Sequence, residues 1–114
     1  MPRHEDIISG YTSMYLVVFF DLPVKKKIDR KEYAHFRKAL LKDGFTMLQY
    51  SVYARYCADN RVLEQHRKTV RESLPPKGGV RVIAITSKMF EKMENFIGRD
   101  AQESEKEPDV CTFY

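Results

Sequence analysis

The fold of this chain is decided by residues 14–23, which read Met-Tyr-Leu-Val-Val-Phe-Phe-Asp-Leu-Pro. Apolar residues run from position 15 to position 20 without polar alternation, which predicts a central strand covered on both faces. Pro23 lacks the N–H that a strand ladder needs, and it disfavours helix at Leu22, so the strand is expected to end at Asp21. One carboxylate therefore lies at the carboxyl end of a buried strand, where open sheets tend to bind ligands.

Two interpretations of Asp21 remain open at this stage. A carboxylate before Leu-Pro often caps a turn by bonding to its own backbone. It can also serve as a metal ligand or general base, because a carboxylate at the mouth of a buried strand is only partly solvated and attracts a hard cation. One acid does not complete a magnesium site, since Mg²⁺ takes six oxygens. Water, a substrate phosphate or Asp21 of a second subunit would have to supply the others.

Length and composition indicate one globular domain, with 114 residues, 43% hydrophobic and 32% charged. No apolar run approaches the roughly 20 residues that span a bilayer. The first six residues carry acids and lack the apolar core of a signal peptide. We therefore expect a cytoplasmic protein with no membrane partner. Its two cysteines, Cys57 and Cys111, are too few and too far apart for a zinc site or a disulfide framework, and we expect reduced thiols.

The net charge of +4 is unevenly distributed. Four acids, Glu103, Glu105, Glu107 and Asp109, lie near the C-terminus, so the body before them is more basic than the total suggests. A polyanionic partner follows as an expectation. We divide the chain into an N-terminal extension (1–13), a folded domain (14–98) and an acidic tail (99–114).

The remaining patterns predict the order strand, helix, strand, strand, helix, strand. A helix is expected over 30–43, with Asp29 as its N-cap and Gly44 ending it, and a second over 61–73, capped by Asp59 or Asn60. Strands are expected over 45–49, 51–57 and 80–86. The first two of these are either separated by a tight turn near residues 49–50 or joined as one kinked strand. Ser87 is expected to cap a last segment whose apolar residues belong to the core, namely Met89, Phe90, Met93 and Ile97.

This order is that of an α+β, ferredoxin-like βαββαβ sandwich. In that fold both helices cover one face of an antiparallel sheet, and the other face normally meets water. Strands one and four nevertheless carry apolar residues on both sides. We therefore expect a homodimer packed sheet to sheet, which also brings two copies of Asp21 toward one two-fold axis.

The first predicted helix and the second differ in what their polar residues suggest. Basic residues on the first helix lie outside its apolar stripe, and they form either a solvated face or part of a phosphate-binding surface: Arg30, Lys31, Arg37, Lys38 and Lys42. On the second helix, His66 falls on the apolar stripe. It is expected to be a packed histidine at the edge of the core and not a ligand.

Four spaced motifs resemble one known family. They are Phe-Phe-Asp-Leu-Pro (19–23), Asp-Arg-Lys-Glu-Tyr-x-x-Phe-Arg-Lys-x-Leu-x-x-x-Gly-Phe (29–45), Met-Leu-Gln-Tyr-Ser-Val-Tyr (47–53) and Pro-Lys-Gly-Gly-Val-Arg-Val-Ile-Ala-Ile-Thr-x-Lys-x-Phe (76–90). Together they resemble the small CRISPR-associated adaptation protein that partners the CRISPR integrase, in the form found in type II systems. The resemblance covers residues 14–98.

The resemblance implies a homodimeric, metal-dependent nuclease acting on RNA or duplex DNA, in which an aspartate pair holds Mg²⁺ between the subunits. Asp21 matches that aspartate, and Phe20 stands where an aromatic residue is common. Ser51 and Tyr53 match a Ser-Val-aromatic segment near the dimer centre. The expected catalytic set is therefore Asp21, Phe20, Ser51 and Tyr53, with Asp21 as the metal ligand. The last strand of the family often swaps across the dimer, and residues 110–114 are the segment left for it here.

The resemblance also implies a role without cleavage, in which the dimer binds duplex DNA and bridges integrase dimers during spacer acquisition. Phosphate contacts would then give affinity and position without reading sequence. The expected contact residues are Lys25, Lys26, Lys27, Arg30, Arg37, Lys38, Lys77 and Arg81. An alternative is a ferredoxin-like dimeric module that binds single-stranded RNA and is unrelated to spacer acquisition.

Overall fold

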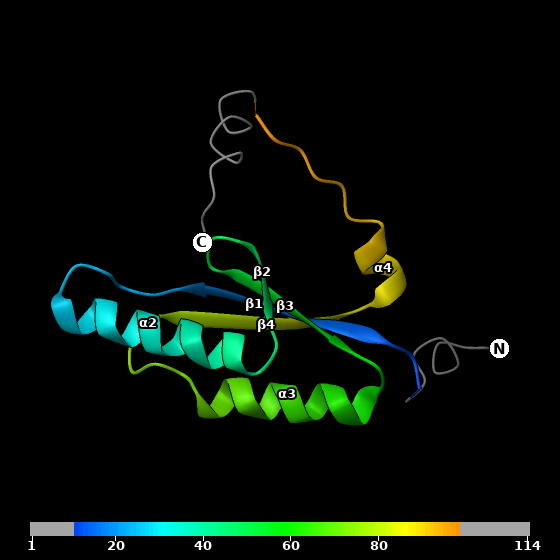
Figure 1. Ribbon diagram of the computed structural model, residues 1–114, viewed down its shortest axis with the longest axis horizontal. Coiled ribbons are helices and arrows are strands. Elements are labelled where there is room, and N and C mark those ends of the chain that lie inside the picture. Colours follow the sequence, from blue (N-terminus) through cyan, green and yellow to red (C-terminus); the bar gives the residue numbers. More distant parts are fainter. Residues whose placement is uncertain (1–10, 99–114) are drawn as a thin grey trace.

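The computed structural model describes residues 11–98. Their elements are, in chain order, β1 (Met14–Asp21), α2 (Lys27–Lys42), β2 (Thr46–Gln49), β3 (Val52–Cys57), α3 (Asn60–Glu72), β4 (Gly79–Thr86) and α4 (Ser87–Glu91). The strands form one antiparallel sheet in the order β2-β3-β1-β4. Both α2 and α3 lie on one side of this sheet, and α4 lies on the other (Figure 1). The predicted α+β, ferredoxin-like architecture is confirmed.

Strand β1 is central because it pairs along its length with β4 and over most of its length with β3. Successive residues of a strand point to opposite faces, so Leu16, Val18 and Phe20 share the helix side. They form the core with residues of both helices and of β3, including Phe36, Leu40, Leu63 and Tyr53. Leu16 is fully buried, and truncating such a leucine to alanine costs about 2–5 kcal/mol of folding free energy.

A turn at Tyr50 and Ser51 separates β2 from β3, which decides the alternative that the sequence left open. Ser51 has φ +66°, a left-handed conformation that few non-glycine residues adopt. The pairing of β2 with β3 also shifts register between Met47 and Gln49. An extra residue on one strand bends it and tightens the local twist.

Helix α2 begins three residues earlier than predicted, because Asp29 is not its N-cap. Lys26 occupies that position, and the Asp29 carboxylate accepts a hydrogen bond from the Lys26 backbone N–H at 3.2 Å. An acid in the first turn suits the positive end of the helix dipole, so the extra turn is stabilised. The predicted end at Gly44 is correct, and this glycine has φ +91°. Asp59 caps α3 by accepting from Val62 N at 2.9 Å.

The prediction that the last apolar segment belongs to the core is wrong for most of its residues in this chain. Helix α4 is short, and Met89 is 60% exposed while Met93 and Ile97 are each more than two-fifths exposed. Phe90 is the exception, since its ring stacks on the ring of Tyr15 with the ring centroids 3.8 Å apart. Thr86, and not Ser87, is the N-cap, accepting from Met89 N at 3.2 Å.

The sheet face opposite α2 and α3 is apolar, as predicted. Phe19 of β1 is 41% exposed and Ile83 of β4 is 50% exposed. Phe90 covers this face only at its Tyr15 end. The second copy that we expect on this face stays a prediction. The segments 1–10 and 99–114 lie outside the described residues; they include Cys111 and the expected swapped strand. Within residues 11–98, no helix is long and apolar enough to cross a membrane.

Candidate functional site

An open hollow of about 400 Å³ lies where β1 ends. Three neighbouring segments supply its lining, which consists of Phe19, Phe20 and Asp21 from β1, Tyr50, Ser51 and Val52 from the β2–β3 turn, and Gly79 and Arg81 from β4. Asp21 is paired across the ladder with Gly79. A Cβ at Gly79 would meet no atom within 4 Å, so the space beside Asp21 is open. The expected ligand end of β1 is thus a real hollow.

Asp21 is exposed, and within residues 11–98 its side chain makes no hydrogen bond or ion pair. The turn-capping interpretation therefore does not describe it. No cluster of three or more His, Cys, Asp or Glu side chains suited to a metal occurs in the described part of the chain. One free carboxylate fits Mg²⁺ in the manner common for that ion, which binds one or two carboxylates and completes its shell with water and substrate phosphate.

Ser51 enters the hollow from a constrained turn. Its backbone carbonyl accepts from Phe20 N at 3.1 Å, which ties the turn to β1. Its hydroxyl lies 3.3 Å from the hydroxyl of Tyr33 on α2. Burial raises the pKa of Tyr33 to about 12, outweighing the hydrogen bond with Ser51, which lowers it. Tyr33 is thus a neutral phenol at ordinary pH.

Tyr53 is not brought to the hollow. It is 1% exposed and faces the helices, where its ring stacks on that of Phe20 at 5.6 Å. Phe20 borders the hollow but is also a core residue, with its ring edge-on to Phe36 at 5.1 Å. Of the four residues expected to act together, the structure therefore gathers Asp21, Phe20 and Ser51, and Tyr53 supports them from the core.

The eight expected nucleic-acid contacts do not share one surface. Arg81 lies in the hollow on the open face of the sheet, whereas Lys38 is exposed on α2, on the helix side. Arg37 is half-buried. Lys25, Lys26 and Lys27 are exposed at the start of α2. Arg30 donates to the carbonyls of Val24 and Lys25 at 3.0 and 2.9 Å, so it anchors this basic loop.

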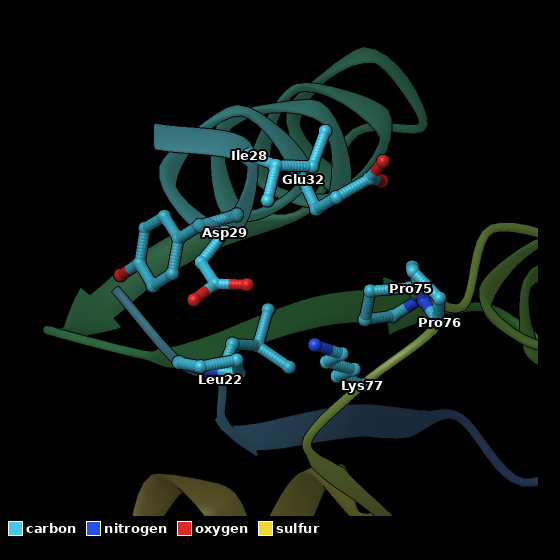
Figure 2. Close-up of a pocket in the computed structure, with 9 residues that line it drawn as sticks. Leu22, Ile28, Asp29, Glu32, Pro75, Pro76 and Lys77 are labelled. Carbon is cyan, nitrogen blue, oxygen red and sulfur yellow. The ribbon is translucent and has the colours of Figure 1, made fainter. Parts of the chain in front are cut away.

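Lys77 points into a second, smaller cavity of about 90 Å³, between the first turn of α2 and the Pro75–Pro76 turn (Figure 2). Its walls are mostly apolar, and Asp29 and Glu32 also line it. The volume is well below the several hundred Å³ of usual small-molecule sites. We therefore take the larger hollow at Asp21 as the candidate site.

The sequence only partly predicted a basic stripe on α2. It consists of Lys27, Lys31, His35, Lys38 and Lys42, which recur at intervals of three or four residues and are all exposed. Residues so spaced lie along one side of a helix, over about 22 Å here. The acids of α2, Asp29 and Glu32, are half-buried and lie off this line. The expected contacts included Lys27 and Lys38 but not the other three, although their spacing in the sequence was the available signal.

Helix α3 is different, because acids neutralise part of its basic charge. Arg67 is 3.2 Å from Glu64, and Lys68 is 4.0 Å from Glu72. His66 is packed at the core edge as expected, with Nδ1 at 2.7 Å from the Asp43 carboxylate and its ring edge-on to Phe45. This histidine is therefore engaged between helices and is not part of the hollow.

Comparison with known sequences places these features in context. Residues 14–93 match the family described as CRISPR associated protein Cas2. A protein of Flavobacterium psychrophilum named CRISPR-associated endoribonuclease Cas2 is 44% identical over 104 residues, covering 91% of this chain and 90% of that protein. A protein of the same name from Paracidovorax avenae is 41% identical, covering 90% of this chain and 95% of that protein. Another, from Parvibaculum lavamentivorans, is 42% identical, covering 83% of this chain and 94% of that protein.

Proposed function

This chain belongs to the CRISPR-associated Cas2 family, and from that premise we propose that it is a dimeric adaptor of spacer acquisition that binds duplex DNA and bridges integrase dimers. The supporting observation is the basic stripe on α2, Lys27, Lys31, His35, Lys38 and Lys42. In this proposal the protein acts in the cytoplasm, where it would meet DNA and the integrase.

The stripe suits a duplex because it is straight and carried on a rigid helix. Duplex DNA has one negative charge per about 1.7 Å of its axis, so a row of about 22 Å passes many phosphates. Ammonium groups held on one side of a helix need little reordering to bind them. Contacts of this kind fix the position of a duplex without reading its sequence.

The dimer is the second part of the proposal, and the open sheet face supports it. Phe19, Tyr56 and Ile83 leave large apolar side chains partly exposed there. Contiguous apolar patches of more than a few hundred Å² are unusual on monomers. A second copy would bury them and would place two stripes on opposite outer sides of one body, as bridging requires.

Charge reversal on the stripe tests the adaptor role. Binding of a fluorescent 30-base-pair duplex is measured with Lys31→Glu/Lys38→Glu, and with Lys68→Glu/Arg71→Glu on α3 as a control of equal charge change. We expect the α2 variant to lose at least about tenfold more affinity than the α3 variant. Equal losses would show that net charge, and not the stripe, governs binding. A protein that binds single-stranded RNA and neither duplex nor integrase would favour the unrelated RNA-binding module.

A second activity, metal-dependent phosphodiester cleavage, is proposed for the hollow at Asp21, with RNA or duplex DNA as substrate. It is supported by the free carboxylate of Asp21, by Arg81 and Ser51 beside it, and by the endoribonuclease names of the relatives. Asp21 would hold Mg²⁺, alone or with Asp21 of a second copy. When bound, the ion supplies stabilisation of negative charge and a more acidic water.

The other residues of the hollow have separable tasks in that reaction. The Arg81 guanidinium would bind a phosphate oxygen and orient the diester. Ser51 would donate a hydrogen bond to the same group. The ring of Tyr50, which is 70% exposed at the rim, offers a surface on which a base can stack.

A further inference from the structure

We infer that Tyr33 is a positioning residue for this hollow, whose hydroxyl donates to Ser51 Oγ and thereby directs the Ser51 hydroxyl proton toward a phosphate oxygen beside Asp21. The inference rests on the proposed binding of phosphodiester groups in the hollow. Tyr33 would not touch the substrate itself.

Tyr33 is held firmly enough to act in this way. It lies on α2, 18 residues before Ser51, and its hydroxyl meets that of Ser51 at 3.3 Å. The ring of Phe20 packs against it at a centroid distance of 5.7 Å, and the ring of Tyr50 stacks on it at 5.9 Å. With ring neighbours in the core and in the turn, the phenol has little freedom to turn away.

The direction of the hydrogen bond follows from the chemistry of the two hydroxyls. Each can donate one proton and accept through its lone pairs. A phenol is the stronger acid and hence the better donor, and burial keeps that of Tyr33 protonated by raising its pKa to about 12. If Tyr33 donates, Ser51 accepts, and the Ser51 proton remains available for another acceptor.

The backbone of Ser51 indicates that its side chain serves a purpose. At φ +66° a glycine would sit without strain, whereas a serine is disfavoured. The serine therefore weakens the turn, and it is one of the residues that line the hollow. Strained residues of this kind concentrate at functional sites.

The hollow supplies the acceptor that this proton requires. Arg81 and Ser51 both line the hollow, and Arg81 brings positive charge to it. Asp21 is exposed at the same edge and would hold a cation. A guanidinium, a hydroxyl donor and a metal ligand are together suited to one phosphodiester group.

The test is a double-mutant cycle on binding, which needs no cleavage. Affinity for a hydrolysis-resistant 2′-O-methyl tetranucleotide is measured in Ca²⁺ for the wild type, Tyr33→Phe, Ser51→Ala and the double variant. We expect Ser51→Ala to weaken binding about tenfold, Tyr33→Phe about threefold, and the double variant no more than Ser51→Ala alone. Thr69→Val removes a hydroxyl from α3, outside both the hollow and the open sheet face, and should bind as the wild type does.

A second probe separates positioning from a merely structural role of Tyr33. In a tetranucleotide with formacetal (O–CH₂–O) linkages no phosphate oxygen remains to accept the Ser51 proton, so the effects of Tyr33→Phe and Ser51→Ala should both vanish. Effects that persist on this neutral probe, losses that simply add, or a wild type that does not bind the charged probe would each overturn the inference. The phosphodiesterase proposal fails by a different result, namely equal Mg²⁺-dependent cleavage by the wild type and Asp21→Asn.

Discussion

Asp21 and Gly79 lie directly opposite each other where β1 ends and β4 begins, and Gly79 adds no side chain to the open space beside the Asp21 carboxylate. A side chain at position 79 would project beside the carboxylate that we assign to metal binding. The pair therefore marks the accessible edge of the hollow. Asp21 is the residue at which the two proposed activities, cleavage and adaptation, can be separated.

Replacing Asp21 by asparagine should separate cleavage from adaptation. The change removes the one carboxylate among the residues described as lining the hollow, so Mg²⁺-dependent cleavage of RNA or duplex DNA should fall by about 100-fold or more. Spacer integration with the integrase present should survive, because in the proposed adaptor role DNA is bound by the stripe, whose residues do not line the hollow, and strand joining is left to the integrase. Both assays are run on the same preparation, with Glu91→Gln as a carboxylate control.

If integration by Asp21→Asn collapses while the protein remains folded, the adaptor role as proposed is wrong and Asp21 takes part in adaptation. If cleavage persists undiminished, the reaction does not occur in this hollow.

Ile83→Glu should break the proposed dimer. Ile83 is 50% exposed on the open sheet face, and a charge there would be buried without a partner in a sheet-to-sheet interface. Sedimentation of the wild type at micromolar concentration should give about twice the 13.4 kDa chain mass, and the variant should give the mass of one chain. Leu41→Glu, at a 40% exposed position of α2, should remain dimeric. A wild type that sediments as one chain would remove the reason to place two Asp21 residues together.

Salt should weaken duplex binding in proportion to the phosphates contacted. For the four lysines of one stripe, the slope of log K against log salt concentration should be about −4. Lys38→Gln should make this slope shallower by about 1. Lys68→Gln on α3, which removes a lysine lying 4.0 Å from Glu72, should leave it unchanged. Equal affinity at 50 and 500 mM salt would contradict electrostatic binding.

Gly44→Ala should destabilise the fold, whereas Gly79→Ala should not. Gly44 has φ +91°, and an added Cβ would lie 2.9 Å from Arg55 Nε, which donates to the Asp43 carbonyl at 3.0 Å. We expect a loss of about 1–2 kcal/mol in the free energy of unfolding by urea. At Gly79 an added Cβ meets nothing within 4 Å, so the change should be below about 0.5 kcal/mol. Equal losses would mean that the left-handed turn at Gly44 is not strained by a side chain.

Alkaline pH should reveal Tyr33 through stability. Its pKa is raised from 10.0 to about 12 in the folded chain, so the folded state holds the phenol proton more tightly than the unfolded state does. The resulting stabilisation is complete below pH 10 and is lost as pH rises from 10 to 12. Tyr33→Phe should therefore flatten the fall in unfolding free energy across this range. An identical fall in the wild type and the variant would show that Tyr33 is not the group responsible.

The sequence alone determined the architecture, because local patterns of apolar, proline and glycine residues predict each element. The apolar run from 15 to 20 and Pro23 set β1 and its end at Asp21, and Gly44 set the end of α2. The alternation of strand and helix patterns then left the ferredoxin-like order, which the sheet confirms. The predicted start of α2 was three residues late, because Asp29 was expected at the N-cap and Lys26 occupies that position. A carboxylate can bind the backbone at the helix start from the first turn as well as from the N-cap, so the sequence does not distinguish the two.

Only the tertiary structure decided which side chains meet. Tyr33 and Ser51 are 18 residues apart and belong to different elements, so no periodicity relates them. The same holds for Tyr53, which shares a sequence motif with Ser51 but is buried in the core. Ser51 belongs to the left-handed turn and Tyr53 to strand β3, and only the packing of β3 against the helices places the Tyr53 ring. Local patterns record how each segment buries its own apolar face. Contacts between segments depend on how those faces pack, and that is settled by the whole chain.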